Sequence, residues 1–154
     1  MTNKVKGNIF VAIQFALLAL LFFVPGGSDW QVATEMSFAL ALLSALGFVI
    51  LIVSAINLGK SLTANPVPLE NAVLKTNGLY SLVRHPIYFG VILLAVAAVV
   101  QSRSFTHLLF GIALFVLFEL KARFEEKLLL VHYPEYATYA SRVGRLIPLI
   151  GRIR

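Results

Sequence analysis

The sequence predicts an all-α membrane protein with about four transmembrane helices and an amphipathic cytoplasmic helical tail toward its C-terminus. Of the 154 residues, 59% are hydrophobic and only 13% are charged, whereas soluble domains are about 45–50% apolar. The apolar residues gather in four runs separated by turn signals. The absence of cysteine excludes disulfides and thiolate metal ligands. We therefore expect a single integral-membrane domain over residues 1–154.

The four apolar runs are the expected spans, because a hydrocarbon core needs about 20 residues of apolar helix. They lie at approximately residues 8–24, 35–58, 86–101 and 105–120. The Pro-Gly-Gly stretch at 25–27 ends the first span, and residues 102–104 form the tight turn of a helical hairpin. After residue 120 the helical pattern continues as the amphipathic tail. The loop at 59–84 is longer than a compact bundle requires, and such loops are often functional.

The basic residues predict how the spans are oriented. With four crossings, all but one of the 13 Lys and Arg residues fall on one side, and Arg103 falls on the other. By the positive-inside rule, this predicts a multi-pass protein with both termini cytoplasmic. The residues on the shared side are Lys4, Lys6, Lys60, Lys75, Arg84, Lys121, Arg123, Lys127, Arg142, Arg145, Arg152 and Arg154. The acidic residues on that side are Glu70, Glu119, Glu125, Glu126 and Glu135.

The positive charge predicts a lipid partner. The formal charge of +6 is spread over the ends of the spans instead of forming one patch, which favours anionic membrane lipids and argues against nucleic acid. No Asp, Glu, Lys or Arg lies in the middle of an expected span, and this disfavours an ion-coupled transporter. The polar residues within the spans are expected to form helix–helix hydrogen bonds. They are Gln14, Ser37, Ser44 and Ser54.

The stretch LYSLVRHPIYFG opens the third expected span. Pro86 fits the first turn of a helix, because its missing N–H would have no partner there. Arg84 and His85 then precede a helix N-terminus, which attracts anions, and the Arg84 fork suits a carboxylate or phosphate. The alternative is membrane anchoring, with a lipid phosphate as the only partner. Tyr88 is typical of an aromatic belt and Gly90 of close helix packing.

Two adjacent carboxylates, Glu125 and Glu126, follow the fourth span. An ordinary solvated helix face explains them, supported by the i,i+4 pairs Glu119–Arg123 and Lys121–Glu125. The alternative is that they face a cation such as an amine or sulfonium ligand, because two carboxylates near an anionic membrane surface repel each other. Both interpretations stay open from the residues alone.

Histidine and tyrosine side chains come next in the tail. His85 and His132 do not have the spacing of a metal site, and without cysteine no metal is assigned. Tyr136 and Tyr139 share a helix face that either stacks on a purine or lies on lipid.

Taken together, these motifs resemble a known superfamily. GLYSLVRHPIYFG, followed by FEEKLLLVHYPEYATYASRVGRLIP, is similar to the isoprenylcysteine carboxyl methyltransferase and phospholipid methyltransferase superfamily of integral-membrane enzymes. Their shared pattern is Gly-x-Tyr leading to Arg-His-Pro-x-Tyr-x-Gly, a helical hairpin, a Glu-Glu pair, then Tyr-x-x-Tyr and Arg-x-x-Pro. The resemblance covers about residues 75–148. The sequence departs from the pattern at Gly144, where many relatives have proline.

The resemblance implies S-adenosylmethionine-dependent methyl transfer to a lipophilic carboxylate, amine or thiol at the cytoplasmic membrane interface. It implies that the third and fourth spans and the tail form the cofactor pocket. The catalytic candidates are Arg84, Arg145 and Glu126. The cofactor-binding candidates are His85, Tyr88, Gly90, Glu125, Glu126, His132 and Tyr136. An NADPH-dependent membrane reductase is the alternative, although a Glu-Glu pair suits an anionic cofactor poorly, and a non-catalytic scaffold or small transporter is the third.

Overall fold

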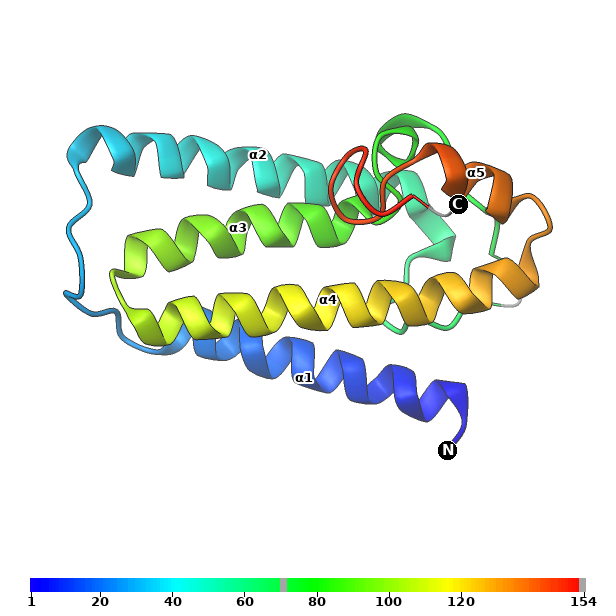
Figure 1. Ribbon diagram of the computed structural model, residues 1–154, viewed down its shortest axis with the longest axis horizontal. Helices are drawn as coiled ribbons and strands as arrows, with labels where there is room; N and C mark the ends of the chain where they lie inside the picture. The colour runs from blue at the N-terminus through cyan, green and yellow to red at the C-terminus, as the bar shows by residue number, and fades with distance from the viewer. Residues whose placement is uncertain (70–71, 153–154) are drawn as a thin grey trace.

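The protein is an up-and-down bundle of long helices, with a short helix at one end (Figure 1). The structure is a computed structural model that describes residues 1–69 and 72–152. Two residues of the predicted charge partition, Glu70 and Arg154, lie outside the described residues. The helices are α1 (Asn3–Phe23), α2 (Thr34–Leu58), α3 (Pro86–Ser102), α4 (Phe105–His132) and α5 (Tyr136–Arg142), with 3-10 turns η1 (Gly59–Ser61) and η2 (Gly78–Ser81).

The expected spans coincide with the long helices, which confirms the all-α class. By length and composition α1, α2 and α4 can cross a membrane, and α3 is a shorter apolar helix of 17 residues. Helix α1 begins at Asn3, ahead of the expected start at residue 8. The Thr2 side chain accepts a hydrogen bond from Val5 N and so satisfies one of the free donors at this helix end.

The predicted tail consists of two helices and an irregular end. Helix α4 continues without a break from the expected span to His132, so the first part of the tail belongs to the same helix. It ends shortly before Pro134, and a proline disfavours helical backbone in the residue before it. Beyond Arg142 the chain leaves the helix, and Gly144 pairs with Val83 in an isolated parallel bridge. The end of the tail therefore lies beside the start of α3.

Helices α2 and α3 approach each other closely at two glycines. A Cβ atom added at Gly47 would lie 2.8 Å from the carbonyl oxygen of Gly90, and one added at Gly90 would lie 2.7 Å from the carbonyl oxygen of Gly47. Small residues at helix contacts let backbones pack tightly in an apolar environment. This contact fixes α3, which carries the Arg-His-Pro motif at its first turn, against α2.

The two connections at the other end of the bundle are bonded to each other. Gly27 N donates to the carbonyl oxygen of Ser102 at 2.8 Å. The Asp29 carboxylate accepts from Phe105 N at 2.7 Å and caps the N-terminus of α4, where a negative charge is favourable. The predicted hairpin of α3 and α4 is therefore fastened to the connection between α1 and α2.

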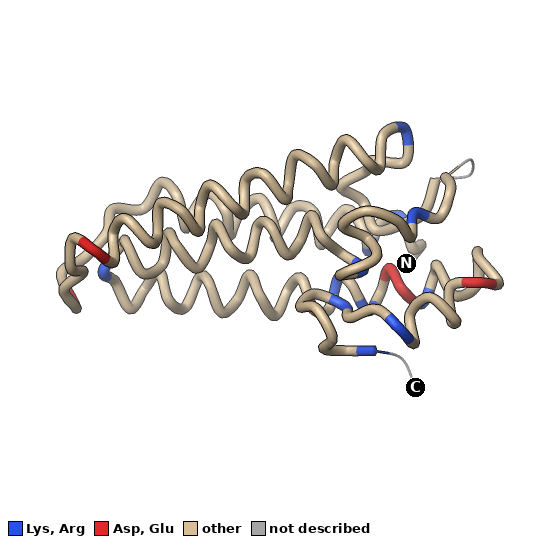
Figure 2. Tube along the Cα trace, turned by 90° about the horizontal axis from the view of Figure 1, so that it is seen from above, with Lys and Arg blue, Asp and Glu red and all other residues tan. Residues whose placement is uncertain are grey.

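Lys and Arg residues gather where α3 begins and α4 ends, and we call this the basic end (Figure 2). Arg103 lies in the turn between α3 and α4, at the opposite end. This geometry agrees with the predicted partition of basic residues. Lys121 of α4 donates to Gln14 Oε1 of α1 at 2.6 Å, which confirms the helix–helix bond expected of Gln14. The hydroxyls of Ser44 and Ser54 instead bond to carbonyl groups of their own helix.

Candidate functional site

The residues before α3 are held beside those that follow α5. Arg84 N donates to the carbonyl oxygen of Gly144 at 2.8 Å, and His85 N donates to that of Arg145 at 3.1 Å. Pro86 then occupies the first turn of α3, as its missing N–H predicts. Two backbone hydrogen bonds thus bring Arg84, His85 and Arg145 to one place at the basic end.

Gly144, where the sequence departs from the family pattern, belongs to a compact loop. A Cβ atom added there would contact the carbonyl oxygen of Ile147 and lie 2.6 Å from Leu149 N. Arg145 N donates to the carbonyl oxygen of Ile150 at 2.7 Å and closes the loop. Glycine is therefore required by space at this position.

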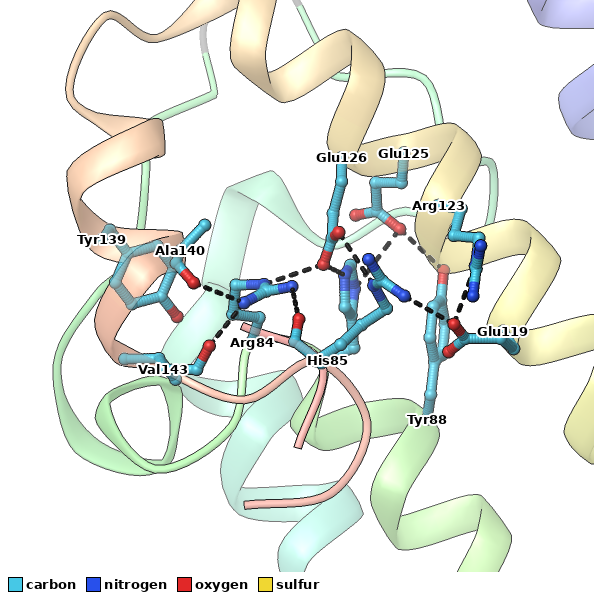
Figure 3. A network of polar contacts seen from close by, with 12 residues as sticks. Arg84, His85, Tyr88, Glu119, Arg123, Glu125, Glu126, Tyr139, Ala140 and Val143 are labelled. Carbon is cyan, nitrogen blue, oxygen red and sulfur yellow. Dashed lines mark hydrogen bonds and ion pairs between the residues drawn. The ribbon is translucent and has the colours of Figure 1, made fainter. Parts of the chain in front are cut away.

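Glu126 of α4 is the centre of a buried charged cluster (Figure 3). Its Oε1 accepts from Arg84 Nε at 2.8 Å and lies 3.2 Å from His85 Nε2, and its Oε2 accepts from Arg145 Nε at 2.8 Å. The side chains of Arg84 and Glu126 are 0% and 3% exposed. Two guanidinium groups favour the ionised form of the carboxylate they contact. The structure therefore brings the predicted Arg84, Arg145 and Glu126 together with His85.

Arg84 also holds the C-terminal segment, which we define as residues 143–152. Its Nη1 donates to the carbonyl oxygens of Ala140, at 2.8 Å, and of Val143. Its Nη2 donates to that of Gly151 at 2.8 Å. One buried guanidinium therefore joins the start of α3, helix α4, helix α5 and the C-terminal segment. Most of its donors are already used inside the protein.

Glu125 is adjacent to Glu126 but has different surroundings. Its Oε2 accepts from Tyr88 OH at 2.8 Å and lies 3.7 Å from His85 Nδ1 (Figure 3). The Glu125 side chain is 26% exposed, and within residues 1–69 and 72–152 its Oε1 accepts no hydrogen bond. The predicted ion pair with Lys121 is not formed, because the Lys121 ammonium bonds to Gln14 instead.

Tyr88 is stacked between two rings at the first turns of α3. Its ring lies parallel to that of His85, with centroids 5.2 Å apart, and to that of Phe118, with centroids 4.9 Å apart. Lys121 Nζ lies 5.1 Å from the Tyr88 centroid, within cation–π distance. The hydroxyl of Tyr88 thereby reaches Glu125 from a ring whose position is fixed.

Two cavities adjoin at the basic end. The loop-side cavity, of about 100 Å³, lies between the loop that follows η1, helix α4 and helix α5. The helix-side cavity, of about 400 Å³, lies against α1, α3 and α4. Their shared walls are Leu58, Thr63, Tyr80, Arg84, His85 and Glu125. Glu125 therefore borders both cavities, one walled largely by loop residues and the other mainly by helices.

The tyrosines of α5 line the loop-side cavity. Tyr136 is 1% exposed, and its hydroxyl has no hydrogen-bond partner among the described residues. Burial and then the charge of Glu126 raise the pKa of Tyr136 above its ordinary value, so the hydroxyl stays protonated. Tyr139 differs, because its hydroxyl donates to the carbonyl oxygen of Tyr80.

Two predicted cofactor-binding residues lie apart from this group. Gly90 lies at the contact between α2 and α3. His132 is exposed at the end of α4, with its ring edge against Tyr133. Neither residue lines the two cavities. In the part of the chain that the structure describes, no group of three or more His, Asp or Glu side chains could hold a metal ion.

Two residues of the site, Lys121 and Glu119, had no predicted role in it. Lys121 is 1% exposed and lines the helix-side cavity. Glu119 accepts from Arg145 Nη1 and from Arg123 Nε, the latter at 2.8 Å. The signal for Lys121 was its spacing, because it lies four residues before Glu125 and therefore on the same helix face. Its partner on α1 could not be read from that spacing.

The fold and site define an integral membrane protein with a charged polar site at one end of an apolar helical bundle. Residues 38–131, more than half of the chain, match the model of the isoprenylcysteine carboxyl methyltransferase (ICMT) family. The chain belongs to this family, which points to methyltransferase activity in general. The matched region includes α3 and nearly all of α2 and α4, whereas α1 lies outside it.

A curated relative is similar over most of the chain. It is the cobalt-zinc-cadmium resistance protein CzcN of Cupriavidus metallidurans (strain ATCC 43123 / DSM 2839 / NBRC 102507 / CH34). The two sequences are 33% identical over 147 residues, which cover 94% of this chain and 63% of the relative. The chain therefore spans less than two thirds of that protein's length.

Proposed function

We propose that this protein transfers a methyl group from S-adenosylmethionine to a lipophilic acceptor at the cytoplasmic face of a membrane. The position of Glu125 carries the proposal, because its carboxylate borders both the loop-side cavity and the helix-side cavity. The gathering of Lys and Arg at the basic end supports a multi-pass orientation with cytoplasmic termini. A polar donor can then enter from water while an apolar acceptor stays in the bilayer.

The donor is assigned to the loop-side cavity. S-adenosylmethionine carries an ammonium and a sulfonium, and Glu125 offers the carboxylate oxygen that no described residue uses. Glu126 is less suited to this contact, because two arginines and His85 already occupy both of its oxygens. The Tyr136 hydroxyl, buried and without a partner in the described residues, supplies a donor or acceptor for a polar group of the ligand.

Donor binding requires the loop-side cavity to widen. Its volume of about 100 Å³ is below the about 300–1,000 Å³ usual for small-molecule sites. Part of its wall is the loop that follows η1: Thr63, Asn65, Pro66, Val67 and Pro68. Outward movement of this loop widens the cavity without disturbing the Glu126 cluster, because the bonds of that cluster come from the two residues before α3, from α4 and from the C-terminal segment.

Methyl transfer from a sulfonium is an in-line displacement. The new bond forms between the acceptor atom and the methyl carbon, the carbon–sulfur bond breaks, and its electron pair stays on sulfur. No covalent protein intermediate is needed, so the protein contributes mainly by aligning donor and acceptor, an effect that reaches about 7–11 kcal/mol in well-oriented systems. Arg84, Arg145 and Glu126 act as positioning residues, because they join α3, α4 and the C-terminal segment.

Keeping the acceptor in the bilayer also lowers the energetic cost of catalysis. Each buried CH₂ group that leaves the membrane costs about 0.8 kcal/mol. The helix-side cavity avoids this cost, because Ile87, Val91 and Phe118 offer apolar surface at the basic end, where an apolar chain can stay buried.

The test measures cofactor binding and transfer separately. Calorimetric titration of the detergent-solubilised protein should show saturable binding of S-adenosylmethionine, weakened about tenfold or more in Glu125→Gln. Lys127→Gln, which changes an exposed charge on the same helix, is the control. Incubation with methyl-labelled donor and total membrane lipid should place label in a base-labile ester or a base-stable amine. No donor binding by the wild type, or protection from heat by NADPH alone, would contradict the proposal.

A further inference from the structure

Lys121 is a buried cation whose partners are neutral. Its side chain lies on α4, is 1% exposed, and donates to Gln14 Oε1 at 2.6 Å. Nζ also lies over the ring of Tyr88. Within the described residues, no carboxylate oxygen lies within 4.0 Å of Nζ. The aromatic face, one amide oxygen and the more distant charge of Glu125, which makes no ion pair with it, are the compensation that the described chain provides for this charge.

This arrangement leaves hydrogen-bonding capacity in the helix-side cavity. An ammonium has three N–H donors, and the Gln14 oxygen accepts from one of them. Burying a charge is unfavourable unless it is paired with an opposite charge or well hydrogen-bonded. The remaining donors border a cavity of about 400 Å³ whose further walls include Ile87, Val91 and Phe118. Such a site matches an amphiphile with an anionic head and an apolar chain.

We propose that Lys121, oriented by Gln14, receives the anionic head of the methyl acceptor and determines acceptor specificity. The role of Lys121 in methyl transfer rests on the proposed function, whereas its role as an anion-binding site does not. Besides two tyrosines, three other ionisable groups border the same cavity close to the donor site, Arg84, His85 and Glu125. The guanidinium of Arg84 is occupied by Glu126 and by backbone carbonyls, so Lys121 is the cation with capacity for a ligand.

Helix α1 thereby becomes part of the acceptor site. Gln14 lies outside the region that matches the family model, and it holds the Lys121 ammonium over the cavity. The charge also distinguishes acceptor from product when the head is a carboxylate. Methylation joins the methyl carbon to a carboxylate oxygen, sulfur keeps the electron pair, and an anion and a sulfonium become a neutral ester and a thioether. The ester has lost the charge that Lys121 attracts and can return to the bilayer.

The test uses single-chain probes that differ only in the head. Hexadecanoate, hexadecyl phosphate, hexadecanol and hexadecylamine are titrated into the purified protein in a neutral detergent, without methyl donor. We expect saturable binding of at least one of the two anions, and no comparable binding of the alcohol or the amine. Preference for hexadecanoate identifies a carboxylate head, and preference for hexadecyl phosphate identifies a phospholipid-like head. Equal binding of the amine or the alcohol would overturn the inference.

Variants separate the site from general membrane electrostatics. Lys121→Gln should weaken anion binding about tenfold or more, and Lys121→Arg should retain part of the binding. Gln14→Glu should also weaken anion binding, because the new carboxylate would form an ion pair with Lys121. Lys127→Gln, with the same change of charge at an exposed position, should bind as the wild type does. Unchanged anion binding in both Lys121→Gln and Gln14→Glu would contradict the assignment. S-adenosylmethionine affinity is measured in parallel, and its absence in the wild type would remove the proposed function while leaving the anion site standing.

Discussion

Arg84 and Glu126 form an ion pair at 2.8 Å between the segment before α3 and the second half of α4, with both side chains withdrawn from solvent (Figure 3). Arg145 extends the pair, because its Nη1 lies 2.5 Å from a Glu119 oxygen and its Nε lies 2.8 Å from a Glu126 oxygen. Two guanidinium groups thus oppose two carboxylates. This balance permits burial of charge beside an apolar bundle.

The two adjacent glutamates should respond differently to the same substitution. Glu126→Gln leaves two arginines without their shared carboxylate, and we expect a loss of about 3–5 kcal/mol of stability. Glu125→Gln removes a partly exposed carboxylate bonded to one tyrosine, and we expect little change in stability but weaker binding of S-adenosylmethionine. Thermal unfolding in detergent and calorimetric titration measure the two effects. Equal loss of stability in both variants would contradict this division of roles.

Arg84→Lys should release the C-terminal segment although the charge is kept. A lysine ammonium cannot reproduce the fork that reaches Glu126, Val143 and Gly151. Hydrogen exchange of the amides at 143–152 should therefore become faster, while exchange in the middle of α2 stays unchanged. Arg123→Lys is the control, because that side chain is 60% exposed and bonds only to Glu119 among the described residues. Protection of the segment in Arg84→Lys equal to the wild type would show that other contacts hold it.

Tyr136→Phe should not destabilise the free protein. The hydroxyl that it removes is buried without a described partner, and removal of such a group costs nothing in hydrogen bonding. We expect weaker binding of S-adenosylmethionine, by calorimetry, with unchanged or raised thermal stability. Because the pKa of Tyr136 is raised, its hydroxyl stays protonated, and the difference in affinity should persist up to about pH 10.

Tyr139→Phe provides the matched comparison on α5. Its hydroxyl donates to the carbonyl oxygen of Tyr80, so its removal should lower stability by about 1 kcal/mol. A Tyr136→Phe variant that is less stable than Tyr139→Phe would argue that the Tyr136 hydroxyl has a structural partner.

Gly90→Ala should separate α2 from α3. The added methyl group meets the carbonyl oxygen of Gly47 and Leu51 N, which are backbone atoms and cannot rotate away. Overpacking of this kind typically costs about 1–3 kcal/mol, measured as a lower unfolding temperature in detergent. Leu46→Ala, at an exposed position next to this contact, should change it far less. An unfolding temperature for Gly90→Ala equal to that of the wild type would contradict close packing of α2 and α3 at this glycine.

The helices could be predicted because their signals are local. Hydropathy located the spans, Pro86 marked the start of α3, and the Pro-Gly-Gly stretch marked the end of α1. Arg84, His85 and Glu126 also meet in one cluster, a grouping that the family resemblance implied and that no local signal encodes. Such residues are recognisable because their types rarely occur near apolar spans without a partner.

The partners of these residues could not be predicted, because they depend on packing between distant elements. The bond between Gln14 and Lys121 joins residues on helices α1 and α4, and periodicity within either helix does not encode it. The same holds for the tail. Helical spacing continues through its sequence, but the chain leaves the helix after Arg142 and Gly144 pairs with Val83 instead. Local propensity yields to tertiary contacts at such positions.

The pairing of Val83 with Gly144 also orders events during biosynthesis. A ribosome delivers Arg84 well before Val143, its partner 59 residues later, and chains fold progressively as they emerge. All of the long helices can enter the lipid while the arginine still lacks these acceptors. A chain released just after α5 would therefore contain all of the long helices but lack the carbonyl groups of Val143 and Gly151 that Arg84 binds.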